Sequence, residues 1–161
     1  MRTGRVPIHP FRLVRPCEGK GEGMDPLEEL WSAALAVFDR AYAPYSRFKV
    51  AAAVRSVSGA VFVGVNVENA AYPVGTCAEA GAIAAMITAG ERSIDAIFIL
   101  GDGAGHTTPC GACRQRLHEF SAPETLVHVG GPEGHRATYT MAELLPHGFA
   151  LDRPRDADEQ D

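Results

Sequence analysis

Three cysteines and one glutamate have the residue types and the spacing of a catalytic metal site. Cys77 lies two residues before Glu79, and Cys110 follows Cys77 by 33 residues and forms a C-x-x-C pair with Cys113. Three thiolates fill three corners of a Zn²⁺ tetrahedron and leave the fourth open for water, which is the catalytic pattern of zinc ligation. A carboxylate beside that water can take and return its proton. The spacing therefore predicts a zinc centre with Glu79 as the proton carrier.

Neither of the two motifs is specific when it is taken alone. A C-x-x-C pair also fits half of a structural zinc site, a redox pair or two buried thiols, and a C-A-E triplet is common in alanine-rich helices. Here both motifs fall where a helix is predicted to begin, and a helix N-terminus stabilises thiolates through its free N–H groups and its dipole. Together they favour a zinc site that hydrolyses an amine, because zinc deaminases combine such an acidic motif with P-C-x-x-C.

Periodicity and turn signals indicate the elements that must position these residues. Asp25 and Pro26 suit the start of a first helix, and the apolar run 94–100 is typical of a strand buried on both faces. The pattern predicts helices over residues 27–41, 78–89, 111–120 and 141–145, and strands over residues 48–54, 61–67, 94–100, 125–129 and 136–139. After the leading helix, the order β-β-α-β-α-β-β predicts a three-layer α/β domain.

Composition and charge argue against several classes of protein. With 46% hydrophobic and 22% charged residues, the chain has the composition of a soluble globular domain, and no apolar run approaches the ~18 residues of a membrane span. A net charge of −5 argues against nucleic-acid binding through clustered basic side chains. The N-terminal stretch lacks the features of a secretory signal. We therefore expect a cytoplasmic protein whose four cysteines, Cys17 included, are thiols or metal ligands rather than disulfides.

The two ends of the chain differ from its middle. Residues 1–24 carry a net charge of +3 and residues 152–161 a net charge of −3, and neither stretch shows helical or strand periodicity. We therefore expect a flexible N-terminal extension (1–24), a zinc-dependent domain over residues 25–151 and an acidic flexible tail (152–161).

Over about residues 25–151 the sequence resembles the cytidine deaminases of the small, homotetrameric, three-cysteine zinc class. Five motifs occur in the family's order: A-P-Y-S-R-F (43–48), N-V-E-N-A-A-Y-P (66–73), T-C-A-E (76–79), P-C-G-A-C-R-Q (109–115) and E-L-L-P followed by Phe149 (143–149). The resemblance implies a cytidine-deaminase-like three-layer α/β fold, in which a mixed five-stranded sheet has helices on both faces.

The resemblance also implies a reaction, a cofactor and an assembly. The family hydrolyses cytidine and deoxycytidine to uridine and deoxyuridine plus ammonia, a step of pyrimidine salvage, with hydroxide at zinc as nucleophile and a glutamate as proton shuttle. Carried over to this chain, one Zn²⁺ per subunit is held by Cys77, Cys110 and Cys113, and Glu79 is the catalytic residue. The partners implied are a small-molecule nucleoside and further copies of the chain in a homotetramer with shared active sites, with no nucleic acid and no membrane.

The resemblance assigns four side chains to the nucleoside. Asn66 and Glu68 hold ribose hydroxyls, for which an amide and a carboxylate supply a donor and acceptors, and alternate positions on one strand would place both on the same face. Phe48 forms an aromatic wall against the pyrimidine, and Tyr72 lines the same pocket. Without the family context, a polar strand end would account for Asn66 and Glu68, and a core position would account for Phe48.

Three further positions follow from the same resemblance. The backbone N–H of Ala78 holds the ring carbonyl of the base, and the backbone carbonyl of Thr108 receives the leaving amine. Phe149 stacks on the base in a neighbouring subunit, with a phenylalanine that caps its own core as the alternative.

The sequence departs from the family pattern at two positions. The family often has an arginine after the catalytic glutamate, where it bonds the zinc thiolates, whereas this chain has Ala80 and its nearest cation in sequence is Arg114. Ala51 stands where the family often has glycine.

Two other functions stay open. A related aminopyrimidine deaminase of the blasticidin-S type shares the zinc motifs. A non-catalytic zinc-stabilised binding protein would need neither Glu79 nor an open metal position.

Overall fold

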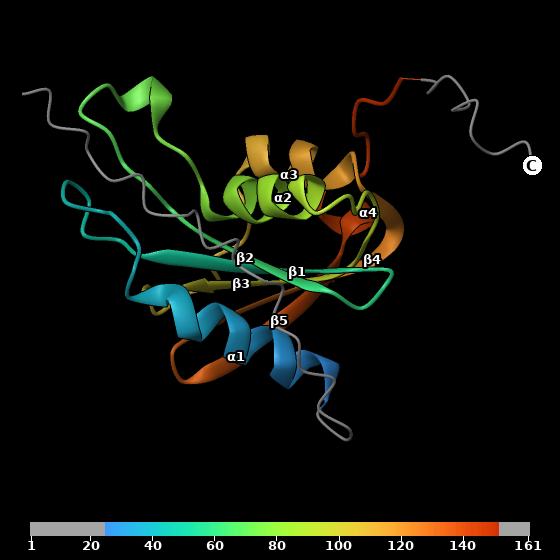
Figure 1. Cartoon of the computed structure of the whole chain (residues 1–161), viewed down its shortest axis with the longest axis horizontal. Coiled ribbons are helices and arrows are strands. Elements are labelled where there is room, and N and C mark those ends of the chain that lie inside the picture. Colours follow the sequence, from blue (N-terminus) through green and yellow to red (C-terminus); the bar gives the residue numbers. More distant parts are fainter. Residues whose placement is uncertain (1–24, 152–161) are drawn as a thin grey trace, which may run out of the picture.

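The computed structural model describes residues 25–151, in which a five-stranded sheet lies between two layers of helices (Figure 1). The strand order is β2-β1-β3-β4-β5; β3 and β4 are parallel, and the other neighbouring strands are antiparallel. The predicted mixed five-stranded sheet and three-layer α/β class are confirmed. The expected flexible ends (1–24 and 152–161) and Cys17 lie outside the described residues. The strands are β1 (Val50–Ser56), β2 (Val61–Val65), β3 (Ile94–Gly101), β4 (Ser121–Gly131) and β5 (Gly134–Thr140).

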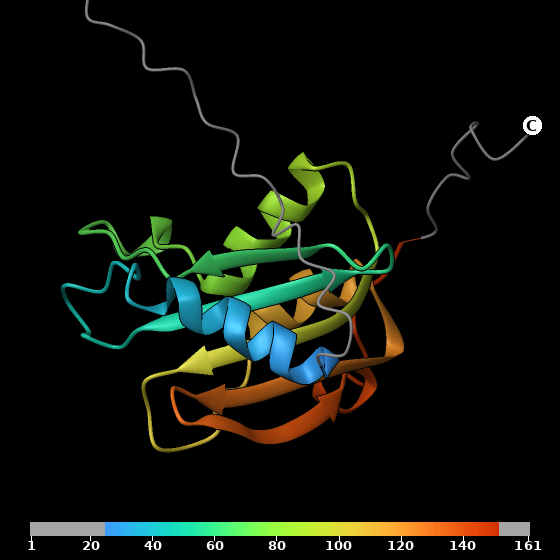
Figure 2. The same ribbon diagram turned by 60° about the horizontal axis from the view of Figure 1, so that its bottom comes forward.

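One face of the sheet is covered by α1 (Pro26–Phe38), which lies in front of the strands in Figure 2. As predicted, Asp25 caps this helix: its carboxylate accepts a hydrogen bond from the backbone N–H of Leu27 (3.1 Å). The helix buries Leu30, Ala34 and Phe38, which are spaced by four residues and so share one face.

The other face carries α2 (Ala78–Thr88), α3 (Gly111–His118) and α4 (Met141–Leu144) (Figure 1). Alternate residues of β1 serve the two layers, as the two-residue period of a strand requires. Ala51 and Ala53 pack with α1, whereas Ala52 and Val54 pack with α2. None of the helices in residues 25–151 is long and apolar enough to cross a membrane.

The structure corrects two predicted boundaries that matter for the site. α1 ends at Phe38 rather than at residue 41, and the chain turns so that the N–H of Tyr42 donates to the carbonyl of Asn66. β2 ends at Val65 rather than at residue 67, so Asn66 and Glu68 do not share a strand as predicted. The ends of the other elements differ from the prediction by at most four residues.

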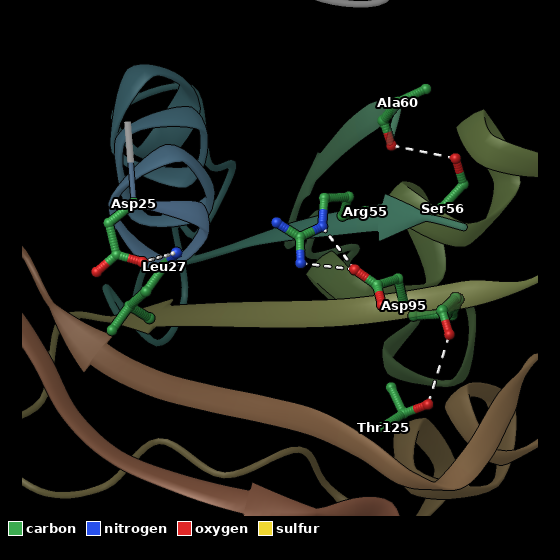
Figure 3. A network of polar contacts seen from close by, with 8 residues as sticks. Asp25, Leu27, Arg55, Ser56, Ala60, Asp95 and Thr125 are labelled. Carbon is green, nitrogen blue, oxygen red and sulfur yellow. Dashed lines mark hydrogen bonds and ion pairs between the residues drawn. The ribbon is translucent and has the colours of Figure 1, made fainter. Parts of the chain in front are cut away.

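A polar network joins three strands near the start of α1 (Figure 3). Arg55 of β1 donates to the carboxylate of Asp95 of β3 through Nε (2.8 Å) and Nη2 (2.6 Å). The hydroxyl of Thr125 in β4 donates to the carbonyl of Ile94 in β3 (3.4 Å). These bonds fix the end of the sheet that lies away from the loops of the functional site.

Candidate metal centre and active site

The N-termini of α2 and α3 bring three thiols together. Cys77 is the N-cap residue of α2, Cys110 is the N-cap residue of α3, and Cys113 lies in the first turn of α3. The three sulfur atoms all lie within 4.8 Å of one another; Cys110 is exposed, Cys77 is half-buried and Cys113 is buried. The structure thus assembles the predicted cysteine set, with the positive ends of two helix dipoles directed at it.

The three thiols differ in their tendency to ionise. Burial, followed by the negative charge of Glu79 and a hydrogen bond with its side chain, raises the pKa of Cys113 far above its usual range. Burial also raises the pKa of Cys77. Burial opposes ionisation of Cys110 as well, but the backbone amide of Cys113 and the neighbouring thiols outweigh it and lower the pKa of Cys110. A divalent cation would displace the thiol protons, because cysteine binds metals as thiolate.

Glu79 is the one carboxylate that is buried among residues 25–151, with 4% of its surface exposed. It lies in the first turn of α2 and hydrogen-bonds the side chain of Cys113. The atoms placed to hold a metal ion jointly are the three sulfurs, and the Glu79 carboxylate is not among them. Burial of a carboxylate costs free energy unless it is paired, so its position beside these thiols points to a functional rather than a stabilising role.

The donor set fits zinc. Soft sulfur ligands select zinc over magnesium and calcium, which prefer oxygen. A divalent ion would offset the negative charge that three thiolates and a neighbouring carboxylate concentrate here. Three protein ligands leave one position of a tetrahedral site for water. A redox pair of Cys110 and Cys113 accounts for the cluster less well, because the sulfur of Cys77 lies equally within reach.

The cation next to these thiols is Arg116 rather than Arg114. Nη1 of Arg116 lies 3.9 Å from Sγ of Cys113, three residues earlier on the same helix. Residues spaced by three share a helix face, so this spacing is the signal that sequence reasoning missed. The guanidinium of Arg114 instead donates to the carbonyls of Pro109 and Leu144, both at 2.9 Å.

A pocket of about 510 Å³ reaches Cys77, one of the three thiols. Its walls come from the segment before β1, the segment after β2 and the short helix η1 (Tyr72–Val74) with the residues that follow it. Three residues predicted to bind substrate line it, whereas Tyr45 and Ser46 are additional pocket residues that only their motif could have indicated. The lining residues are Tyr45, Ser46, Asn66, Val67, Glu68, Asn69, Tyr72, Gly75, Thr76 and Cys77.

Asn66 joins the pocket to the start of β1. Its Oδ1 accepts a hydrogen bond from the N–H of Val50, and its Nδ2 donates to the carbonyl of Phe48, both at 2.9 Å. The backbone N–H of Asn66 still donates to the carbonyl of Val50 (3.0 Å), but the side-chain oxygen replaces the Asn66 carbonyl as the acceptor for Val50, since that carbonyl accepts from Tyr42 instead, and the regular ladder of β2 stops at Val65. Because an amide has two donors and two acceptor lone pairs, Asn66 retains capacity for a ligand.

Glu68 holds the opposite wall of the pocket. Its Oε2 accepts hydrogen bonds from the backbone N–H groups of Tyr45 (2.8 Å) and Ser46 (3.2 Å). The hydroxyl of Ser46, together with these amides, lowers the pKa of Glu68, so the side chain is a carboxylate at neutral pH. The rings of Tyr45 and Tyr72 meet edge to face, with centroids 6.2 Å apart. The second carboxylate oxygen adds an acceptor to a wall that is otherwise aromatic.

Comparison with known proteins shows the family to which the chain belongs. Residues 24–129 match the family model of the cytidine and deoxycytidylate deaminase zinc-binding region. The chain belongs to this deaminase family. The match includes all three thiols and Glu79, and the protein is therefore a zinc-dependent hydrolytic deaminase.

Relatives and solved structures agree with this assignment. A cytidine deaminase of Halalkalibacterium halodurans is 38% identical over 123 residues, which cover 76% of this chain and 93% of the relative. A cytidine deaminase of Mycoplasma pneumoniae is 42% identical over 115 residues, which cover 70% and 86%. The crystal structure of cytidine deaminase from Burkholderia pseudomallei matches with a TM-score of 0.73 at 41% identity, covering 78% of this chain and all of that one. The predicted cytidine-deaminase-like fold is thereby confirmed.

In this deaminase the loop between β3 and α3 supports Phe48. Nη1 of Arg136 in β5 donates to the carbonyls of Gly103 (2.5 Å) and Gly105 (2.6 Å). Gly103 in turn lies against the ring of Phe48, since a Cβ on this glycine would stand 3.1 Å from the ring. Phe48 is 40% exposed, so it lies at the surface rather than in the core, and it is not among the residues that line the pocket.

Ala78 and Thr108 place backbone groups near the thiols. Ala78 is the first residue of α2, so its N–H has no carbonyl partner within the helix. Thr108 precedes Cys110 by two residues, and its hydroxyl accepts a hydrogen bond from Nη2 of Arg114 (3.4 Å). That these backbone groups bind the base stays a prediction.

Phe149 lies apart from the pocket of its own chain. Its side chain is 69% exposed, which argues against the alternative in which it caps its own core. The residues that line the pocket all lie between Tyr45 and Cys77 in the sequence, so Phe149 is not one of them. The structure therefore does not bring Phe149 together with the other predicted substrate-binding residues of the same subunit.

Proposed function

We propose that this protein hydrolyses cytidine and deoxycytidine to uridine and deoxyuridine with release of ammonia, a reaction of pyrimidine salvage. The observation that carries the proposal is the buried carboxylate of Glu79 beside three metal-binding thiols, one of which, Cys77, lines a pocket that also contains Asn66 and Glu68. The relatives named cytidine deaminase support the choice of base.

The chemistry follows from the positions of these groups. Cys77, Cys110 and Cys113 would hold Zn²⁺, which would lower the pKa of a water molecule and so make it a nucleophile at neutral pH. As the oxygen of this water bonds to C4, Glu79 takes the proton that the water releases and passes it to the ring nitrogen beside C4. The same carboxylate then takes the remaining proton of the oxygen on C4 and delivers it to the amino group, so that the C4–N bond breaks, ammonia leaves and a carbonyl remains at C4.

Recognition of the nucleoside uses three kinds of group. Polar side chains with spare hydrogen-bonding capacity bind the ribose hydroxyls, and aromatic side chains offer their faces to the base. Backbone groups beside the metal bind the ring carbonyl and the amino group. Asn66 and Glu68 bind the ribose, and Phe48 and Tyr72 face the base. The backbone groups are the N–H of Ala78 and the carbonyl of Thr108.

The proposed enzyme is a homotetramer whose subunits share active sites. This assembly is supported by Phe149, which is exposed and lies outside its own pocket. A cytoplasmic location suits a centre that depends on free thiols. The net charge of −5 supports a free nucleoside rather than a polynucleotide as the substrate.

The proposal is tested by following the loss of substrate absorbance with cytidine, deoxycytidine, cytosine, adenosine and blasticidin S, while zinc is measured on the same sample. We expect turnover of the first two compounds and about one Zn²⁺ per subunit, since one three-thiol centre holds one ion. Turnover of blasticidin S alone would favour the related aminopyrimidine deaminase. Full zinc content with no turnover of any compound would favour a binding protein.

A further inference from the structure

The side chain of Gln115 holds the backbone of Phe149 by two hydrogen bonds. Nε2 of Gln115 donates to the carbonyl of Phe149 (2.8 Å), and Oε1 accepts from the N–H of the same residue (3.1 Å). The amide thus replaces a neighbouring strand and fixes both the position and the direction of the Phe149 backbone. Gln115 lies on α3, two residues after Cys113.

Two further contacts hold the segment 144–149 against the same helix. The carbonyl of Leu144 accepts a hydrogen bond from Arg114 (2.9 Å). Gly148 passes so close to His118 that a Cβ on this glycine would stand 2.6 Å from the imidazole. Because these contacts restrain the backbone, the exposed ring of Phe149 has a defined place outside its own subunit's core.

Phe149 does not line the pocket of its own chain. Figure 1 shows the segment that ends at residue 151 and the helix η1 beside the pocket at opposite ends of α2 and α3. The side chains of Phe149 and Leu151 are both largely exposed. An apolar pair held in a fixed position on the surface fits an interface with a second copy of the chain.

We propose that Gln115 is a positioning residue that orients Phe149 for the base site of a neighbouring subunit. The inference rests on the shared sites of the proposed function and adds the residue that makes the sharing specific. Gln115 acts on the neighbour's site through Phe149, although it belongs to the helix that carries two thiols of its own subunit. Its loss therefore leaves the metal centre of its own subunit intact.

Steady-state kinetics give the first test. Gln115→Ala removes both hydrogen bonds, and Gln115→Glu retains the acceptor but removes the donor to the Phe149 carbonyl. We expect either variant to lose about tenfold in kcat/KM, mainly through KM, because an ordered contact residue becomes mobile. Zinc content and Tm should stay close to the wild type, since the freed backbone groups are exposed and meet water. Thr88→Ala is the control, because it removes an exposed hydrogen bond from a side chain to a backbone carbonyl on α2 (2.7 Å).

Mixed subunits give the decisive test. Glu79→Gln subunits have no proton carrier but present an intact Phe149. Gln115→Ala subunits retain Glu79 but lack a well-placed Phe149. After subunit exchange in an equal mixture, half of the subunits retain Glu79, and half of those receive a well-placed Phe149 from a neighbour. We therefore expect about one quarter of the wild-type activity for random exchange in a closed oligomer. The mixture of Glu79→Gln with Phe149→Ala should behave in the same way.

The possible results distinguish a failure of the role of Gln115 from a failure of the shared active site. Rescue of Phe149→Ala but not of Gln115→Ala would overturn the role of Gln115, because its defect would then lie in its own subunit's site. Loss of zinc from Gln115→Ala would have the same meaning. If neither variant is rescued once exchange has been shown by native mass spectrometry, the shared site itself is wrong, and the role of Gln115 is overturned with it.

Discussion

Gly64 of β2 and Gly81 of α2 meet backbone to backbone: a Cβ on Gly81 would stand 3.5 Å from the Cα of Gly64. In the opposite direction there is no space, since a Cβ on Gly64 would stand 2.3 Å from the carbonyl oxygen of Ala78 and 2.4 Å from the nitrogen of Ala82. The first turn of α2, which carries Glu79, therefore rests directly on the backbone of an edge strand.

This contact predicts opposite results for two glycine-to-alanine variants. Gly64→Ala should push the start of α2 away from the sheet, lower the Tm and reduce the zinc content, because Cys77 moves with the helix. Gly81→Ala should be tolerated, because its Cβ meets only ordinary contacts and alanine favours a helix by up to ~1 kcal/mol over glycine. Thermal unfolding and zinc analysis of both variants test the prediction. Equal loss in the two variants would show that the helix is not positioned by this contact.

Replacement of Glu79 by glutamine should separate catalysis from metal binding. Glutamine preserves the shape of the side chain but cannot carry the proton, so kcat should fall by about 10²- to 10⁴-fold. Because Glu79 is not among the atoms placed to hold the metal, zinc content and fold should be preserved. Near-normal turnover of the zinc-loaded variant would remove Glu79 from the proposed mechanism.

Removal of a thiol should have the opposite signature. Cys110→Ala leaves two sulfurs at the centre, so zinc and folding stability should be lost together, since the free energy of metal binding contributes to folding. Zinc per subunit and Tm, measured before and after addition of a chelator, test this. If the variant retains zinc and the wild-type Tm, the metal is bound at another site.

The guanidinium of Arg116 should tighten zinc binding. It approaches the sulfur of Cys113, where a positive charge offsets the excess negative charge of a zinc ion with three thiolates. Arg116→Ala should therefore raise the Kd for zinc by about tenfold or more, a usual cost of losing a partner of a metal ligand. Competition with a chromophoric chelator measures the Kd. Arg92→Ala, which removes the charge of an exposed arginine, is the control, and an equal shift in both variants would reduce the effect to net charge.

The stability of the fold should decrease below neutral pH because of His128. Burial, followed by the positive charges of His135 and Arg55, lowers the pKa of His128, while Asp25 opposes them. The unfolded chain therefore binds a proton at a higher pH than the folded one, and stability that is present above pH ~6.5 is lost as the pH falls. Urea unfolding at pH 8 and pH 5.5 should show a smaller loss for His128→Gln than for the wild type. Equal losses would assign the pH dependence to other groups.

The sequence was sufficient for those features that depend on local pattern. The apolar run of β3, the cap of α1 at Asp25 and the two Cys-bearing helix starts all follow from short-range rules, and each is confirmed. The end of β2 was predicted wrongly, because the side-chain oxygen of Asn66, rather than its backbone carbonyl, accepts the hydrogen bond from Val50. Residue types alone cannot reveal that a side-chain oxygen accepts this hydrogen bond, because the two segments must first be placed side by side.

Contacts between distant segments account for the rest of what was missed. Arg114 was singled out for its proximity in sequence, but a residue one position after Cys113 lies on another face of the helix, and Arg116 at a spacing of three meets the sulfur. The packing of Gly103 on Phe48 and the bonds of Gln115 to Phe149 join residues that are far apart in the sequence. No local pattern announces them.

The helix α3 has consequences for how this enzyme can evolve. Cys113 and Gln115 stand within one turn, yet in the proposed assembly they serve different active sites, one in their own subunit and one in the neighbour. A substitution in this turn is therefore tested by selection at two sites simultaneously. Where two diverged copies of such a gene are expressed in one cell, a change that suits one copy alone would produce mixed tetramers with defective sites. The turn should accordingly change more slowly than the rest of the helical surface.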